Sequence, residues 1–287
     1  MADAADHRAL THLSAAETGL HRVLMRPRAL AYASLALLDA AGWAALGLML
    51  GTELNAGRRL LAALCQPAFG VSAASLTAEL ALVTLMWAAM TFAMMLPTAG
   101  PMVLTYAEIA ETAAQKGERV VSPLILTAGY LAVWLVFAFA ATLLQVGLTR
   151  LAGIDPALGE ASGLFSGAVF IGAGIYQFSA LKHACVTQCQ RPFPFFFANW
   201  STVPRTVFRL GLRQGLYCLG CCWAMMLVML AVGVMNVVWM ALLGVVMGVE
   251  KLMSTTRFSR AVGIVFCLIG AGFIVMSVLA HWPAPQG

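Results

Sequence analysis

The feature that most constrains this chain is a series of long, almost uncharged apolar runs. Of its 287 residues, 61% are hydrophobic and only 10% are charged. Several runs reach the roughly 20 residues that a helix needs to cross a bilayer. Inside a bilayer every backbone amide must be bonded within its own segment, so such runs have to be helical. The sequence therefore predicts an all-α, polytopic transmembrane helical bundle, and it excludes a soluble globular domain.

The runs divide into about seven spans, with the amino terminus in the cytoplasm. The division near Gly233 is the least obvious, because the apolar stretch around it is too long for one crossing and barely enough for two. Charge decides it: with seven spans, all but three of the 17 Lys and Arg lie inside, whereas merging spans five and six would move three more outside. The predicted spans are residues 29–50, 78–104, 123–148, 161–181, 212–232, 234–249 and 261–280.

The chain is expected to form one transmembrane domain at 29–281, between a cytoplasmic segment at 1–28 and a short tail at 282–287. Residues 1–28 are polar and too long for the n-region of a cleaved signal peptide. The excess of basic residues sets topology in a membrane protein. We therefore expect contact with membrane lipid and no binding of nucleic acid.

Cysteine carries the best chemical signal. Five of the seven cysteines lie in two clusters, Cys185-x-x-x-Cys189 and Cys218-x-x-Cys221-Cys222. On a helix Cys218 neighbours both Cys221 and Cys222, at i+3 and i+4. The charge count puts both clusters on the cytoplasmic side, so we expect them to converge. Thiolates are soft ligands that suit Cu(I) and Zn(II), which predicts a metal site.

Methionine extends this pattern. Met225 lies seven residues after Cys218 on the same predicted helical stripe, and span two carries Met90 and Met94, with Met95 beside them. Thioethers favour copper over zinc. Methionine also fills gaps in apolar cores, so packing is the competing interpretation of these four residues.

Prolines and one pair of adjacent charged residues lead to further predictions about local structure. Pro97 and Pro101 are expected to interrupt the end of span two, and the two prolines within 191–197 to block a regular helix there. Glu250 and Lys251 close span six and could form an interfacial ion pair with each other.

Several of these pieces together resemble a known family. They are, in chain order, Met90-Thr-Phe-Ala-Met94-Met95-Leu-Pro97, Tyr176-Gln177, Cys185-x-x-x-Cys189-x-Arg191-Pro192, Gly215-x-x-Cys218-x-Gly220-Cys221-Cys222-Trp223, Met235-Asn236-x-x-Trp239-Met240 and Glu250-Lys251. By their joint spacing the chain is similar to the bacterial family of predicted metal-binding integral membrane proteins, a domain of unknown function (DUF 2182).

The resemblance implies a multi-pass protein of the bacterial cytoplasmic (inner) membrane. It implies that the five clustered cysteines, together with Met90, Met94 and Met95, occupy the family's metal-binding positions. It further implies a small soluble partner protein or a larger membrane complex. Ala180 stands where the resemblance leads us to expect proline.

Three functions fit the sequence. The leading hypothesis is binding of a soft metal ion, a copper ion as Cu(I) with zinc as the alternative, for metal handling or delivery. The second is a membrane thiol-disulfide oxidoreductase in which Cys218 and Cys221 cycle between dithiol and disulfide. The third is a non-catalytic membrane subunit of a larger complex. Whether the protein is an enzyme is therefore left open by the sequence.

Overall fold

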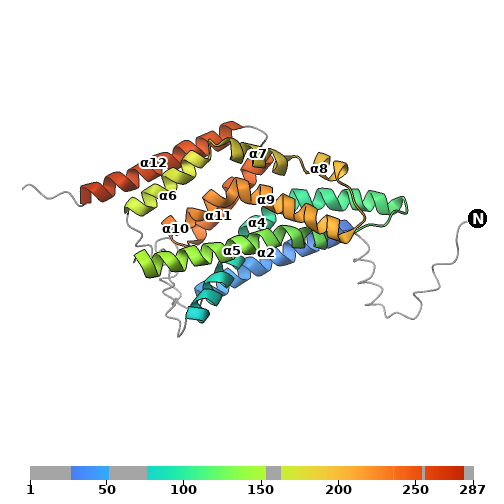
Figure 1. The fold of residues 1–287 in the computed structure, drawn as a ribbon, viewed down its shortest axis with the longest axis horizontal. Coiled ribbons are helices and arrows are strands. Elements are labelled where there is room, and N and C mark those ends of the chain that lie inside the picture. The colour runs from blue at the N-terminus through green and yellow to red at the C-terminus, as the bar shows by residue number, and fades with distance from the viewer. Residues whose placement is uncertain (1–26, 52–75, 153–162, 235, 254–255, 281–287) are drawn as a thin grey trace, which may run out of the picture.

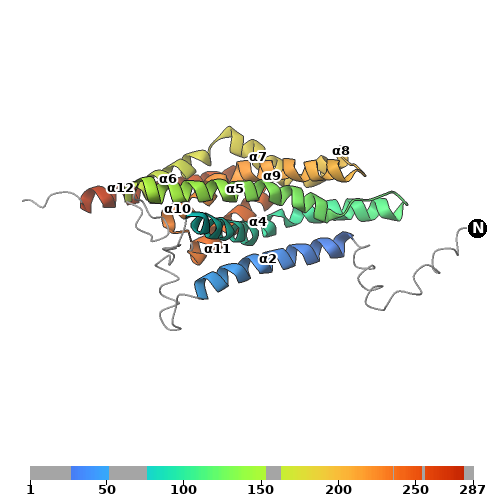
Figure 2. The ribbon, with the colours of Figure 1, turned by 60° about the horizontal axis from the view of Figure 1, so that its bottom comes forward.

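The structure, a computed structural model, describes residues 27–51, 76–152, 163–234, 236–253 and 256–280. Within these ranges all regular structure is helical and no strand is present, which confirms the predicted all-α class. Figures 1 and 2 show the long helices lying side by side along the molecule. The helices are α2 (Pro27–Gly51), α4 (Leu76–Gln115), α5 (Pro123–Ala152), α6 (Gly163–Tyr176), α7 (Ala180–Gln190), α8 (Pro192–Ala198), α9 (Pro204–Leu227), α10 (Met229–Val232), α11 (Val237–Leu252) and α12 (Thr256–Ala280).

A helix occupies the position of each predicted span. By length and composition, four helical segments of the described chain could cross a membrane, and a fifth could if a bent pair of helices is counted as one span. The bent pair is α6 and α7, which meet at 65°. The seven-span count and the cytoplasmic amino terminus stay predictions.

The division near Gly233 has a clear local cause. Gly233 has a φ of 95°, a left-handed conformation that favours glycine, and it follows the end of α10. Asn236 then caps α11, because its side chain accepts a hydrogen bond from the backbone N–H of Trp239 at 3.2 Å. The apolar stretch is therefore divided at Gly233, with α9 and α10 before it and α11 after it.

The two expectations about proline had different outcomes: α4 is bent along its length (Figure 1) but is not ended by its prolines, and the expected absence of a regular helix at 191–197 was wrong. α4 continues as one helix through Pro97 and Pro101 to Gln115. At this level the hydroxyls of Thr98 and Tyr130 both donate to the carbonyl of Met95, so side chains supplement the backbone bonding. The segment 191–197 also contains a helix, α8. Its prolines lie in the first turn, where a backbone N–H would have no partner within the helix.

Two glycines let α5 and α9 approach each other closely. A Cβ added to Gly129 would lie 2.2 Å from the carbonyl oxygen of Phe208, and one added to Gly211 would lie 2.1 Å from that of Leu126. Only glycine permits such an approach of two backbones. This contact fixes α9, the helix that carries Cys218, against α5.

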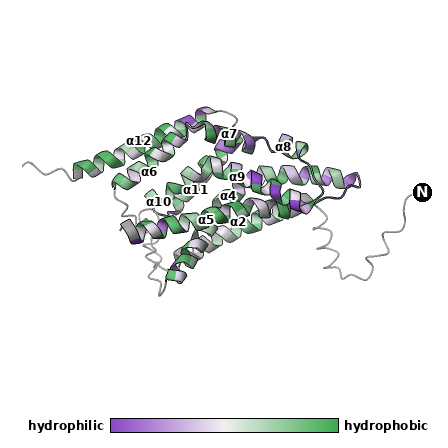
Figure 3. Ribbon diagram, in the orientation of Figure 1, coloured by the Kyte–Doolittle hydropathy of each residue, from purple (hydrophilic) through white to green (hydrophobic). Residues whose placement is uncertain are grey.

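The outer faces of the bundle are apolar. α12 exposes large side chains such as Leu268 and Met276, which are 68% and 69% exposed. Figure 3 shows hydrophilic residues on α7 and on the ends of α4 and α9 that lie near α8. An apolar surface of this extent suits lipid rather than water.

Candidate metal centre

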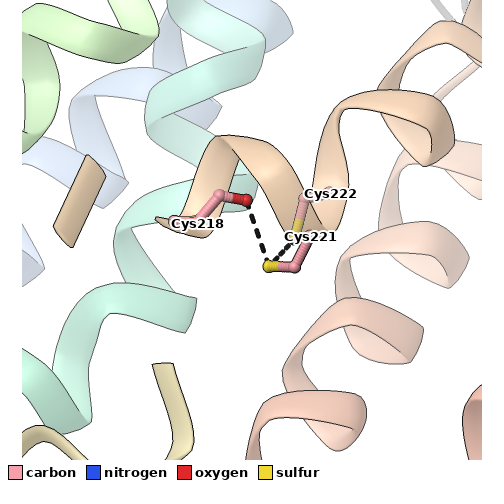
Figure 4. A group of neighbouring side chains, drawn as sticks. All are labelled: Cys218, Cys221 and Cys222. Carbon is pink, nitrogen blue, oxygen red and sulfur yellow. Dashed lines mark hydrogen bonds between the residues drawn. The ribbon is translucent and has the colours of Figure 1, made fainter. Parts of the chain in front are cut away.

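Three thiols gather on one turn of α9. Cys218, Cys221 and Cys222 are only 2%, 1% and 1% exposed, and their sulfur atoms all lie within 4.8 Å of one another. The Cys221 and Cys222 sulfurs are 3.2 Å apart, and Cys221 Sγ donates to the backbone carbonyl of Cys218 at 3.1 Å (Figure 4). The i, i+3, i+4 spacing predicted this grouping, since such residues share a helix face.

Cys218 also has polar partners from two other helices. The Tyr130 hydroxyl on α5 lies 3.0 Å from Cys218 Sγ, and Lys251 Nζ at the end of α11 donates to the same sulfur at 3.0 Å. Lys251 Nζ donates as well to Thr98 Oγ1 on α4, at 2.6 Å. A cation beside a sulfur favours its thiolate form, which is the form that binds metal.

The second cysteine pair lies on α7, which packs against α9. Cys189, near the carboxyl end of α7, lines the same cavity as Cys218. Cys185 contacts the backbone of α9, since a Cβ on Gly220 would lie 2.6 Å from its sulfur. The structure thus brings both cysteine clusters together, with Cys189 next to the three α9 thiols and Cys185 at their side.

A buried ion pair connects α7, α9, α11 and α12 beside the thiols. Lys182 on α7 is fully buried, and its Nζ donates to Glu250 Oε2 on α11 at 2.7 Å and to the Cys221 carbonyl on α9 at 3.0 Å. Ser259 on α12 donates to the other carboxylate oxygen of Glu250. The pairing of Glu250 with Lys251 expected from the sequence was wrong. Adjacent residues on a helix point in different directions, so each finds a separate partner.

A cavity of about 140 Å³ lies beside Cys218. Its walls come from α4, α5, α9 and α11, together with the junction of α7 and α8. The polar lining residues are Thr98, Tyr130, Cys189, Gln190, Gln214, Cys218 and Lys251.

The predicted methionine ligands are all buried. Met90, Met94 and Met95 lie in the core on α4, and Met225 lies on α9 one turn beyond the thiols. Met94 lines a separate cavity of about 430 Å³, whereas Met102 lines the one beside Cys218. The role of the four as metal ligands stays a prediction.

Sequence reasoning missed the polar residues that surround the thiols. Tyr130, Gln214 and Lys182 are buried, and Lys251 bonds directly to Cys218. The signal that could have found them is a polar side chain within or at the end of an apolar span, because such residues usually face the bundle interior. Gln214 also precedes Cys218 by four residues, which places both on one helix face.

Comparison with models of known protein families gives a match over most of the chain. The model of the PpoB2 family, described as a copper chaperone, matches residues 84–273. No curated protein and no solved structure matches the chain. The matched range holds both cysteine clusters, the ion pair and the residues around Cys218. The description supports the copper hypothesis made from the thiols, and the DUF 2182 resemblance stays a prediction. The match spans most of the 287 residues, and the chain belongs to the PpoB2 family of copper chaperones.

Proposed function

We propose that this protein binds Cu(I) at Cys218, Cys221 and Cys222 and passes it on to another protein. The observation that carries the proposal is three buried thiol sulfurs within 4.8 Å of one another. Copper is the cargo of such a site rather than a resident cofactor. The family match supports a role in handling this metal.

The composition of the site favours Cu(I) over zinc. Structural zinc sites are almost always four-coordinate, whereas α9 offers three thiols on one turn. A fourth thiolate for zinc would have to come from another helix, and the candidate is Cys189 of α7, which lines the same cavity as Cys218. Thiolate ligands suit Cu(I), and the Lys251 ammonium offsets part of the negative charge that they bring into a buried place.

The proposal places the protein in the bacterial cytoplasmic membrane, with the thiols in the cytoplasmic half of the bundle. The apolar outer faces and the basic residues predicted to lie inside support this arrangement. A small soluble protein or a larger membrane complex is the expected recipient or donor of copper. The cavity that Cys218 shares with the exposed Leu252 supports such an exchange.

Metal analysis of detergent-purified protein tests the proposal. We expect near-stoichiometric copper in wild type after growth with copper, and its loss when Cys218, Cys221 and Cys222 are all changed to serine. The matched control is Cys267→Ser, because Cys267 lies on α12 and packs against Gly174. That variant should keep its copper.

Two results would overturn the proposal. Copper retained by the triple variant would place the metal elsewhere. A well-folded, reduced wild-type sample without metal would favour a thiol-disulfide oxidoreductase, if alkylation with and without reductant reveals a disulfide, or a non-catalytic subunit if it does not.

A further inference from the structure

The cavity beside Cys218 has a polar end that lacks a partner. Gln214 is 2% exposed, and its Nε2 has no hydrogen-bond partner among the described residues. Leaving a buried amide N–H unbonded costs about 1–3 kcal/mol, which suggests that a ligand or water normally fills the space. The amide lies on the same wall of α9 as Cys218, one turn earlier.

The groups on this cavity favour an incoming anion. Lys251 uses two of its three N–H groups, on Cys218 Sγ and Thr98 Oγ1, so one remains for a ligand. Gln214 offers two more donors. Among the residues that the structure describes, no Asp or Glu lines the cavity, and apart from the thiols its one charged side chain is that of Lys251.

The cavity also reaches the surface of the protein. Its lining includes Leu252, which is 74% exposed, as well as Cys189 and Gln190, which are half-buried. The opposite wall is formed by the buried Tyr130 and Cys218. A water molecule occupies about 30 Å³ of liquid, so a cavity of about 140 Å³ has room for a group of several heavy atoms, such as a cysteine side chain.

We infer that this cavity is a port that admits one anionic thiolate ligand to the Cys218 side of the thiol cluster, with Lys251 and Gln214 as its docking groups. The inference rests on the proposed function, which it extends by naming the route of exchange. An incoming thiolate bonds to Cu(I), the bond from copper to Cys218 breaks, and the released Cys218 thiolate pairs with Lys251. Copper stays Cu(I), and no electron or proton is transferred.

Thiol labelling of the metal-free protein tests the port without copper. Wild type is treated with an anionic methanethiosulfonate (sulfonatoethyl) or a cationic one of similar size (trimethylammonioethyl), and labelled cysteines are located by peptide mass spectrometry. We expect the anionic reagent to label Cys218 about tenfold faster. The variant Lys251→Gln should lose this preference, and Gln214→Leu should slow the anionic reaction several-fold.

The matched control is Gln177→Leu. Gln177 is also fully buried with an unbonded amide, but it does not line the cavity, so the labelling rates should not change. No labelling of Cys218 by either reagent, or equal rates for both reagents in wild type, would overturn the port even if the cluster binds copper. Selective labelling of a protein that binds no copper would instead overturn the proposed function.

A second arm identifies the source of the thiolate. Copper-loaded protein is mixed with thioglycolate, with cysteamine as its cationic counterpart, or with a short acidic peptide that carries one cysteine. Faster copper release by thioglycolate alone indicates a small-molecule ligand, and faster release by the peptide as well indicates a cysteine side chain of another protein. Equal release by thioglycolate and cysteamine would contradict an anion-selective port.

Discussion

Lys251 provides the cation nearest to the thiols, with its Nζ 3.0 Å from Cys218 Sγ. Three thiolates around Cu(I) carry a net negative charge, and in a buried place that charge needs a counter-charge. A hydrogen bond to a charged group is worth about 1.5–3 kcal/mol. We therefore predict that Lys251→Gln weakens Cu(I) binding by about 10- to 100-fold.

Competition with a colorimetric Cu(I) chelator measures this affinity in detergent. Lys116→Gln is the control, because Lys116 is exposed just after α4 and away from the thiols, and it should bind copper as wild type does. An unchanged Kd in Lys251→Gln would mean that the ammonium does not stabilise the loaded site.

Glu250 is the only described carboxylate bonded to the buried Lys182 ammonium. Removing one member of a buried ion pair leaves the other uncompensated and costs about 3–5 kcal/mol. We predict that Glu250→Gln lowers the thermal unfolding midpoint in detergent strongly, whereas the exposed Glu118→Gln leaves it unchanged.

A double variant separates charge from packing in this pair. Lys182→Met combined with Glu250→Gln removes both charges, so it should recover a large part of the stability that Glu250→Gln loses. A double variant as unstable as the sum of its two single variants would show that the pair is not coupled through its charge.

For individual residues, the sequence predicted that the three thiols gather on one helix face, but it did not predict the side chains that surround them. The spacing of Cys218, Cys221 and Cys222 fixes their grouping once α9 is a helix, so local geometry was enough. The partners Tyr130 and Lys251 come from α5 and α11, and such contacts depend on how the helices pack and rotate. Spacing within one segment carries no information about that rotation.

The contact of α5 with α9 sets where the thiols lie. A methyl group at Gly129 would collide with the backbone of Phe208, which cannot move without shifting α9. We predict that Gly129→Ala destabilises the protein by about 1–3 kcal/mol and weakens copper binding, because α9 and Tyr130 would separate.

Gly147→Ala is the control on the same helix, since an added Cβ there meets nothing within 4 Å. It should be neutral or slightly stabilising, because alanine is the better helix former. Thermal unfolding and copper content of the two variants in parallel give the comparison. Equal stability of both variants would argue against a close α5–α9 contact.

Helix positions were predictable from apolar runs, whereas helix ends and breaks were not. Pro97 and Pro101 lie inside α4, whose helix continues with hydroxyl groups bonded to its backbone. Pro192 and Pro194 open α8 rather than prevent it. In both places the outcome depends on where the proline falls relative to the helix start and on neighbouring side chains.

The orientation of the whole bundle in the membrane is predicted from the distribution of Lys and Arg between the two sides. Seven spans place the end of α11 and the turn after α4 in the cytoplasm, and the end of α5 outside. Reporter fusions test this: a fusion after Leu252 or Lys116 should be active as a cytoplasmic reporter, and one after Arg150 as a periplasmic reporter. A periplasmic signal after Leu252 would contradict the seven-span arrangement and remove the thiols from the cytoplasmic side.

The length of α4 has a consequence for any protein that exchanges copper with this one. Measured along its bent path (Figure 1), its 40 residues cover about 60 Å at 1.5 Å per residue, roughly twice the thickness of the hydrocarbon core. In the predicted seven-span arrangement one end of α4 lies beyond the lipid, and beside α8 the Tyr106 ring packs edge-on against Phe196 and at a tilt of 35° against Trp200. A water-soluble partner approaching this end would meet the exposed Phe193 and Phe197 of α8, which cover the buried Tyr106 and Phe196. The orientation in which that partner bound α8 would determine whether its own copper ligands faced the cavity beside Cys218 or the solvent.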